Sequence, residues 1–591
     1  SSHFASSCFQ SAALTCSLQR SRLLCMLPAA AFAVTAPLPG WGPRLAPHSA
    51  ADAAARARVA TAPRAARSAD RTRGGDGEAD AAVVAAAALV SGATAAALLG
   101  QHTRGKRSRR AEWRRRSVAV VRQAACKDFL SFVANTGSPA HTVLESKARL
   151  VKAGFSELKS GAEWKLQPGG LYFVTSEGTS IWAFAVGGKF SPKEGGVLIA
   201  AGHTDSPCLK VRPRAKLPSN AGTVQLGVDT YGGGLWHTWF DRPLGFAGKV
   251  VVASEPAGLE EKLVRLDAPL CLIPNLAIHL QTTEERAAFS FNKETHLRPV
   301  LCKPCGSTAP ASKETKDKKD KKEDDEEENL GPQQPEELLA EVAKAAGVKP
   351  EQILDVDLCL MDATPPCMVG DYVSSPRIDN VLSTWAAVDA LAEFADIRSS
   401  NGGLKDSVDI CCAASFDHEE VGSTSATGAD SQILERWLDK ALGSLGCSWS
   451  AVADRSFLLS CDCAHGLHPN YADKHQPQHQ PLLGKGVVIK TNANQRYATT
   501  PILAQMVREV GKKDQVPIQE FVVRNDCPCG STIGPLLSSQ LGLRTVDVGA
   551  PQWAMHSCRE TAHSADVASL QKLCLGLFKN FRAVDNSTRR L

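Results

Sequence analysis

Two adjacent carboxylates that directly follow an apolar run are the strongest chemical feature of this sequence. The run from Ile410 to Phe416 is typical of a buried strand, and Asp417-His418-Glu419-Glu420 comes next. Neighbouring carboxylates at such a strand end are costly unless a cation neutralises them or one of them takes up a proton. A metal centre meets both conditions, because Glu420 can bind an ion and Glu419 can act as general base. A solvated acidic turn is the alternative interpretation of an isolated Glu-Glu pair.

Other candidate ligands occupy similar places along the chain. His203 and Asp462, like Glu420, lie just past the end of an apolar run, where functional groups of open α/β sheets gather. Asp379 precedes a helical pattern, and His556 lies in a loop that contains Gly and Pro. Oxygen and nitrogen ligands without a thiolate suit zinc, manganese or cobalt, and two ions rather than one. Taken singly, each of these residues fits a structural role better than the role of a ligand.

The elements that must position these residues follow an alternating pattern. Apolar runs predict strands, and apolar residues at helical spacing predict helices. Strands are expected at 172–175, 181–186, 197–201, 408–416, 457–461, 487–490, 517–523 and 544–548. Helices are expected at 121–133, 140–153, 381–394, 502–510 and 565–581. This alternation predicts an α/β fold with a mixed sheet that helices cover on both faces.

The segment 207–365 has a different pattern of apolar runs and turns, which predicts a β-rich domain inserted into the α/β domain. Strand-like runs at 224–228 and 244–252 alternate with turns, and helical spacing returns at 335–346. The α/β domain would then consist of residues 117–206 and 366–585. Within the insertion, 306–337 carries blocks of like charge without apolar residues, which predicts a disordered loop. An interaction tail is the alternative for this segment.

The first 116 residues predict a targeting leader rather than a folded domain. An apolar run at 23–34 is followed by an Ala/Arg tract at 50–73, a second apolar run at 81–100 and a basic flank at 104–110. This order resembles the bipartite plastid leaders of algae with complex plastids. We therefore expect a plastid or another organelle, with membrane contact only through the leader. A disordered extension of a cytoplasmic protein is the alternative.

Composition excludes several classes of protein. The 591 residues are 43% hydrophobic and 22% charged, which is ordinary for a soluble globular chain. A formal charge of +5 is too small at this length to indicate nucleic-acid binding. Nineteen cysteines show no regular framework spacing, so we expect mostly small buried side chains rather than disulfides or zinc sites.

Several motifs together resemble one family of enzymes. They include Gly202-His203-Thr204-Asp205-Ser206-Pro207-Cys208, Asp229-Thr230-Tyr231-Gly232-Gly233-Gly234, Asn275-Leu276-Ala277-Ile278-His279-Leu280, Asp417-His418-Glu419-Glu420-Val421-Gly422-Ser423 and His468-Pro469-Asn470-Tyr471. In this order they resemble the aspartyl aminopeptidase family, M18, whose members are dinuclear zinc peptidases. The resemblance runs from Val121 to Phe581 and covers nearly all of the foldable chain. One departure is His418, where the family more usually has Asn.

The resemblance implies a metallopeptidase catalytic domain that holds two divalent ions, zinc first, with manganese or cobalt as alternatives. Asp379 would bridge the ions, and the remaining ligands would be His203, Glu420, Asp462 and His556. Asp205 would orient the imidazole of His203. Glu419 would be the general base that activates a water and then protonates the leaving amine.

The resemblance also implies how substrate is bound. Lys490 would meet the side-chain carboxylate of an acidic N-terminal residue, although by itself it reads as a surface lysine that ends a strand. His465 and Tyr497, with Asp462, would contact the substrate. His279 would reach from the inserted domain into the site of a neighbouring subunit and stabilise the oxyanion.

The expected activity is removal of N-terminal Asp or Glu from peptides. The inserted domain would serve dimerisation, and dimers would assemble into a dodecamer. The alternatives are a peptidase of the same fold with another specificity and a non-catalytic oligomeric scaffold. Intact Glu419 and the complete set of ligands speak against a scaffold, because buried charges of this kind are costly.

Overall fold

The computed structural model describes residues 122–256, 258–302, 333–396 and 403–588. All of them belong to one compact unit, Thr94–Leu591. The predicted leader, residues 1–116, lies outside the described residues, as does most of the charged segment 306–337. Within the described ranges, none of the helices combines the length and the apolar character that crossing a bilayer requires.

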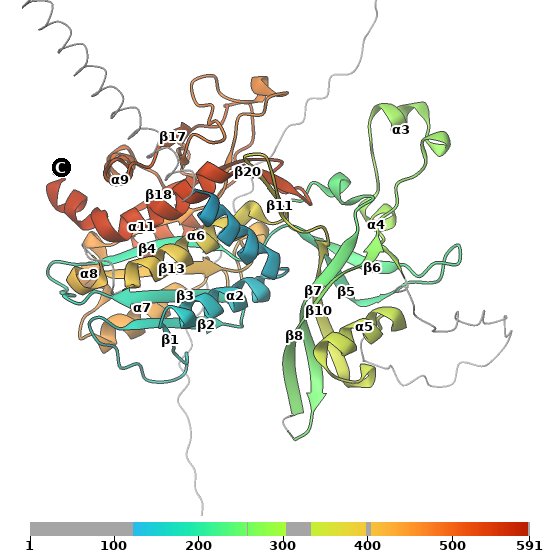
Figure 1. The fold of residues 1–591 in the computed structure, drawn as a ribbon, viewed down its shortest axis with the longest axis horizontal. Helices are drawn as coiled ribbons and strands as arrows, with labels where there is room; N and C mark the ends of the chain where they lie inside the picture. Colours follow the sequence, from blue (N-terminus) through green and yellow to red (C-terminus); the bar gives the residue numbers. More distant parts are fainter. Residues whose placement is uncertain (1–121, 257, 303–332, 397–402, 589–591) are drawn as a thin grey trace, which may run out of the picture. The chain divides into compact units, whose positions relative to one another are not determined.

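A nine-stranded mixed sheet forms the α/β domain (Figure 1). Its strands, in spatial order, are β1 (Ser156–Glu157), β2 (Leu171–Ser176), β3 (Ser180–Val186), β13 (Ile410–Phe416), β4 (Val197–His203), β14 (Phe457–Cys461), β18 (Thr545–Gly549), β16 (Val487–Lys490) and β17 (Ile518–Phe521). β4 runs parallel to both of its neighbours, whereas β3–β13 and β16–β18 are antiparallel pairs. The predicted mixed sheet is confirmed, and every strand expected outside 207–365 is present with small shifts of its ends.

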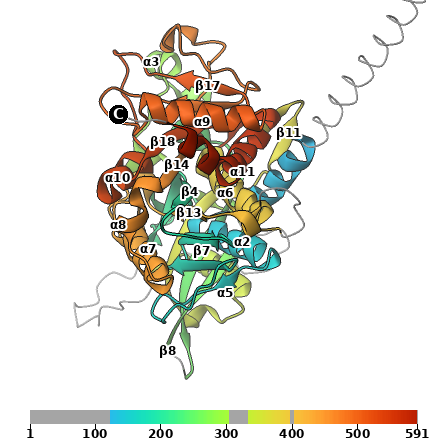
Figure 2. The same ribbon diagram turned by 90° about the vertical axis from the view of Figure 1, so that its left-hand side faces the viewer.

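Helices cover both faces of this sheet (Figure 2). One face packs against a helix at 122–135 and against α2 (Pro139–Lys152), α6 (Ile378–Ala395), α9 (Pro501–Lys513) and α11 (Ser564–Ser587). The other face packs against α7 (Ile433–Ser444), α8 (Trp449–Val452) and α10 (Ile533–Leu541). β4 serves both cores, because Leu198 and Ala200 face the first while Ile199 and Ala201 face the second. A strand buried on both faces explains why β4 reads as one continuous apolar run.

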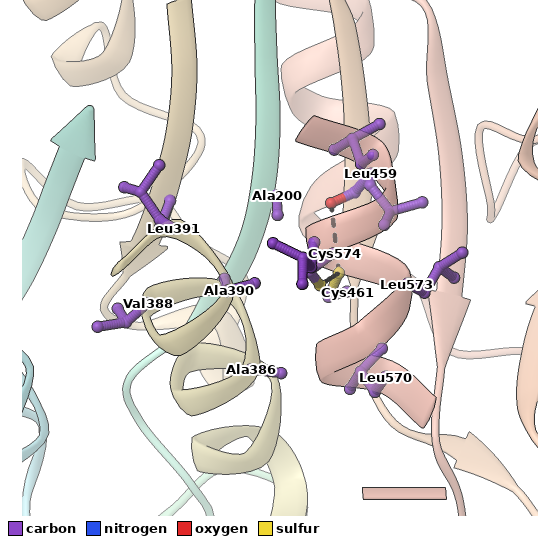
Figure 3. Close-up of a cluster of buried hydrophobic side chains, with 14 of the residues drawn as sticks. Ala200, Ala386, Val388, Ala390, Leu391, Leu459, Cys461, Leu570, Leu573 and Cys574 are labelled. Atoms are coloured by element: carbon purple, nitrogen blue, oxygen red, sulfur yellow. Dashed lines mark hydrogen bonds between the residues drawn. The ribbon is translucent and has the colours of Figure 1, made fainter. Parts of the chain in front are cut away.

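Close packing beneath α6 and α11 depends on small side chains (Figure 3). Ala386 and Ala390 are fully buried on the side of α6 that faces α11, which carries Leu570 and Cys574. Between this helix and the sheet, the thiol sulfurs of Cys461 and Cys574 are 3.9 Å apart. Contact with the Cys574 thiol and burial raise the pKa of Cys461, so it behaves as an inert apolar group. Most cysteines that the structure describes are likewise buried and free, as expected.

A second, antiparallel sheet is built from the segment predicted to be β-rich. Its six strands, in spatial order, are β6 (Leu226–Tyr231), β5 (Cys208–Lys216), β10 (Ile353–Asp362), β7 (Leu244–Ser254), β8 (Gly258–Leu272) and β9 (Val300–Leu301). The helix α5 (Glu336–Ala346) packs against it around a separate core. The connection between β8 and β9 carries the short helices η2 (Ile278–Leu280), α3 (Thr283–Ala287) and α4 (Lys293–His296). The predicted β-rich character of this segment is therefore confirmed.

The end of the charged segment corrects one prediction. We expected disorder as far as residue 337, but residues 333–337 are ordered and α5 begins at Glu336. The side chain of Gln334 is 3% exposed and donates hydrogen bonds to the carbonyl oxygens of Arg212 and Pro213, at 2.8 and 2.9 Å. These bonds attach the segment to β5, and the charge pattern alone gave no sign of them.

A third sheet of short strands joins distant parts of the chain. Its order is β11 (Cys367–Val369), β12 (Tyr372–Ser375), β20 (Glu560–His563), β19 (Pro551–Trp553) and β15 (Ala464–His465). β12 leads into α6, and β20 follows the loop that contains His556. Their antiparallel pairing places the start of α6 next to that loop.

Candidate metal centre and active site

Three of the predicted ligand positions meet at one edge of the nine-stranded sheet. His203 is the last residue of β4, Glu420 follows β13 in the short helix η5 (Glu419–Val421), and Asp462 directly follows β14. The three strands are parallel neighbours, so their carboxyl ends lie side by side. The sheet topology explains why residues so far apart in the sequence converge here.

Two further ligand positions come from irregular backbone. Asp379 lies inside α6 but has φ −83° and ψ 109°, which are not helical. His556 has φ 65°, in the left-handed region that few residues other than glycine adopt. Asp379 stands between the two histidines, with Oδ1 3.5 Å from Nε2 of His203 and Oδ2 3.7 Å from Nε2 of His556.

The five side chains form two groups that share Asp379. The first contains His203, Asp379 and Asp462, with Nε2 of His203 3.9 Å from Oδ1 of Asp462. The second contains Asp379, Glu420 and His556, with Nε2 of His556 3.5 Å from Oε2 of Glu420. Within each group the candidate ligand atoms lie within 4.8 Å of one another. This is the arrangement of two adjacent cation sites with a carboxylate between them.

The residues also fit metal ions chemically. Oδ1 of Asp379 and Oε1 of Glu420 are buried and have no hydrogen-bond partner in the described part of the chain. Burial and then the charge of Asp379 raise the pKa of Glu420 well above its ordinary value, which means that its negative charge is poorly compensated by protein groups. A divalent cation would compensate it, and a set of nitrogen and oxygen donors suits zinc or manganese.

Asp205 supports both of the segments that carry these ligands. Its Oδ1 lies 3.2 Å from Nδ1 of His203 and accepts the main-chain N–H of Glu419 at 3.1 Å. Its Oδ2 accepts the N–H of Glu420 at 3.0 Å and the hydroxyl of Tyr231 at 2.6 Å. Because Tyr231 ends β6, the second sheet takes part in holding this carboxylate.

Glu419 belongs to neither of these two groups, although it forms a third possible ligand group with His203 and Glu420. Its Oε2 lies 3.7 Å from Nε2 of His203. Burial raises the pKa of Glu419 to about 8. The charge of His203 opposes this increase, whereas the charges of nearby carboxylates add to it. Divalent ions beside Glu419 would lower this pKa toward neutrality, where a carboxyl group can both accept a proton and release it.

A cavity of about 620 Å³ opens in front of the ligands, and the predicted substrate residues line it. Lys490 is 3% exposed, so the alternative of a surface lysine is wrong. Its ammonium lies 3.3 Å from Oδ2 of Asp462, donates to the carbonyl oxygen of Cys463 at 3.2 Å and stands 5.1 Å from the ring centroid of Tyr497. His465 faces the cavity, where the surrounding protein and then the charge of Lys490 lower its pKa to about 4.

The structure does not bring His279 to this cavity. It lies exposed on η2, in the connection between β8 and β9 of the second sheet. Its neighbours Leu276, Ile278 and Leu280 are also exposed, at 52%, 60% and 71%.

Some residues with a role at the site were not predicted from the sequence. Tyr231 and Glu560 hold the ligand segments, and Arg496 lines the cavity with its guanidinium donating to the carbonyl oxygen of Cys529. Tyr231 stands in one of the motifs that carried the resemblance, so a signal was available. Arg496 directly precedes the predicted Tyr497, whereas nothing around Glu560 marks it as more than a strand residue.

A family model described as "Aminopeptidase I zinc metalloprotease (M18)" matches residues 132–581. The chain belongs to the M18 family. The aspartyl aminopeptidase of Caenorhabditis elegans is 43% identical over 457 residues, which cover 76% of this M18 chain and 94% of the relative. The aspartyl aminopeptidase of Aspergillus oryzae is 42% identical over 487 residues, which cover 77% and 95%. This M18 protein is accordingly an aminopeptidase, a hydrolase.

Solved structures of M18 proteins share the fold. The structure titled "Cryo-EM structure of the Ape4 and Nbr1 complex" aligns with a TM-score of 0.73 at 37% identity, covering 80% of this chain and 89% of that one. The Saccharomyces cerevisiae mApe1 dodecamer aligns with a TM-score of 0.66 at 26% identity, covering 79% and 99%. The extent of these alignments confirms the combination of an α/β domain with a β-rich domain.

Proposed function

We propose that this M18 aminopeptidase removes N-terminal aspartate or glutamate from peptides with the help of two divalent metal ions. The observation that carries the proposal is Asp379, whose two oxygens face two separate groups of ligands. His203, Asp379 and Asp462 would hold one ion, and Asp379, Glu420 and His556 the other. Zinc is the first choice because of the family, with manganese or cobalt as alternatives.

The ions, when bound, would supply Lewis acidity, which polarises the scissile carbonyl and lowers the pKa of a water toward about 7. Glu419 takes a proton from the attacking water as the new C–O bond forms. It then gives that proton to the leaving amine as the C–N bond breaks. Asp205 holds the N–H groups of Glu419 and Glu420, so one carboxylate fixes the base and a ligand relative to each other.

Lys490 is our candidate for recognition of the acidic side chain. It is a buried cation on the cavity wall, close to His465 and Tyr497. Burial would lower its pKa, but the charge of Asp462 outweighs this and raises it, so Lys490 stays charged. A fixed positive charge in a low-dielectric cavity favours a substrate carboxylate over a neutral side chain. The names of the similar aspartyl aminopeptidases support this specificity.

Homo-oligomerisation belongs to the same proposal. The dodecameric mApe1 relative supports assembly of dimers into a dodecamer. The exposed apolar side chains around η2 are suited to a subunit contact, which would let His279 enter a neighbouring cavity. The segment 207–365 would be the assembly domain inserted between the catalytic parts 117–206 and 366–585. The leader would direct the protein to an organelle, with the cytoplasm as the alternative.

The test is hydrolysis of a panel of peptides that differ only in the N-terminal residue, using the full chain with and without a chelator. We expect chelator-sensitive release of Asp and Glu, restored by zinc. Release of neutral residues instead would keep the metal chemistry and contradict the specificity. No release from protein that binds metal and forms the oligomer would favour the scaffold interpretation.

A further inference from the structure

The main-chain N–H groups of two proposed ligands donate hydrogen bonds to a single side chain. Asp379 donates its N–H to Oε2 of Glu560 at 3.0 Å, and His556 donates its N–H to Oε1 of the same residue at 2.8 Å. Both donors sit in irregular backbone, where no helix or sheet hydrogen bond fixes them. One carboxylate therefore fixes the main-chain N–H of both ligands. Other contacts add to this, because Nδ1 of His556 lies 3.1 Å from the carbonyl oxygen of Gly233 and Ser206 donates its hydroxyl to the carbonyl oxygen of Asp379.

Glu560 is buried, and its other contacts are uncharged. It is 2% exposed, and no lysine, arginine or histidine among the described residues forms an ion pair with it. The main-chain N–H of Ile378 also donates to its carboxylate, and Nε2 of Gln552 lies 3.5 Å from Oε1. Burying a carboxylate without a cation is costly, so a stabilising role alone is a weak explanation for it. A nearby divalent ion would offset that cost.

The fold places Glu560 where the two ligand segments meet. It is the first residue of β20 and pairs with Ser375 of β12, just before the segment that carries Asp379. The turn between His556 and Glu560 brings the carboxylate back toward the histidine N–H. Glutamine could not replace it fully, because its amide has one acceptor oxygen and would turn an NH₂ group toward the second donor.

We propose that Glu560 is a positioning residue that presets Asp379 and His556 for the ion they would share. It does not contact the ion or the substrate itself, and it acts through the backbone of both ligands. The inference rests on the proposed function, because it assumes that Asp379 and His556 bind metal. Residues that orient metal ligands in this indirect way typically change metal affinity about 10- to 100-fold when replaced.

Asp566 provides a matched control within the same chain. It is fully buried and accepts two main-chain N–H bonds, from Gly484 and Gly486, at 2.5 and 2.7 Å. It does not line the catalytic cavity. If Glu560 serves stability only, Glu560→Gln and Asp566→Asn should behave alike. If Glu560 positions ligands, only its replacement should change metal binding.

The experiment measures Zn²⁺ and Co²⁺ affinity of the full-length, metal-stripped protein by competition with a chromophoric chelator. It also records the visible spectrum of the Co²⁺ form and the thermal unfolding of each variant. We expect Glu560→Gln to weaken binding of the ion held by Asp379 and His556 by about 10- to 100-fold, more than binding of the ion that shares only Asp379, and to change the Co²⁺ spectrum. Asp566→Asn should lower the unfolding temperature while leaving the affinity and spectrum as in the parent.

Folded Glu560→Gln with parental affinity for both ions and a parental spectrum would overturn the inference. If Glu560→Gln does not fold, Glu560→Asp decides, because it keeps the charge and shortens the reach. Parental metal affinity in Glu560→Asp would then overturn the inference, and weakened binding of one ion would support it. His556→Ala separates this outcome from failure of the proposed function: if it still binds two ions, the ligand set itself is wrong.

Discussion

Replacing Tyr231 with Phe removes one oxygen atom and tests whether the second sheet supports the metal centre. The Tyr231 hydroxyl donates at 2.6 Å to Oδ2 of Asp205, the atom that also accepts the N–H of Glu420. A hydrogen bond to a charged acceptor contributes about 1.5–3 kcal/mol. If all of that free energy is lost from metal binding, the affinity falls by roughly 10- to 150-fold. If it is lost from folding, the free energy of unfolding falls by the same 1.5–3 kcal/mol or so.

The assay measures both quantities on Tyr231→Phe: urea unfolding of the metal-stripped protein and zinc affinity by chelator competition. Tyr172→Phe is the control, because its hydroxyl accepts a hydrogen bond from the neutral N–H of Gln167 at 3.2 Å, away from the ligands. We expect the control to have a small effect. For Tyr231→Phe, the losses of unfolding free energy and of zinc-binding free energy should sum to about 1.5–3 kcal/mol. Parental stability together with parental zinc affinity would refute the reasoning.

Three more predictions follow from the site and the core. Glu419→Gln should lower kcat by about 10²- to 10⁴-fold while metal content by mass spectrometry is unchanged, and loss of metal would contradict the separation of base from ligands. Lys490→Ala should reduce kcat/KM for acidic N-terminal residues far more than for neutral ones, whereas equal reductions in protein with full metal content would exclude recognition. Burial, followed by the charges of nearby arginines, lowers the pKa of His141 to about 4, so the unfolded chain takes up a proton first as the pH falls below about 6.5. The contribution of His141 to the unfolding free energy should therefore fall by at most roughly 3 kcal/mol between pH 6.5 and 4, and His141→Gln should flatten the measured pH slope in urea titrations by up to this amount; an unchanged slope would contradict the assignment.

The sequence was most informative where one physical signal dominated. Continuous apolar runs such as 197–201 and 457–461 mark strands buried on both faces, and the observed β4 and β14 contain them. Helix α7 shows an equally clear signal of another kind, because its apolar residues recur at helical spacing, yet it was not predicted. The buried residues on this face are Ile433, Leu434, Trp437, Leu438 and Ala441. The strands β19 and β20 carry no comparable pattern, because they are short and are held by pairing with distant β12 and β15.

The sequence indicated the candidate ligands and one of their supports, Asp205, but not the supports Tyr231 and Glu560. The positions of His203, Glu420 and Asp462 follow from where apolar runs end. The burial of Lys490 does not, because one polar residue at the end of a strand looks the same whether a cavity or solvent lies beyond it. Glu560 is a harder case, since its role depends on which N–H groups the tertiary fold brings to it.

The position of β4 has a consequence for synthesis of the protein. β4 lies between β13 and β14, which are made only after the whole six-stranded sheet has left the ribosome. His203 thus waits for partners encoded far downstream, and the last of the five candidate ligands in the sequence is His556. A growing chain therefore cannot bring all five together before residue 556 has been made.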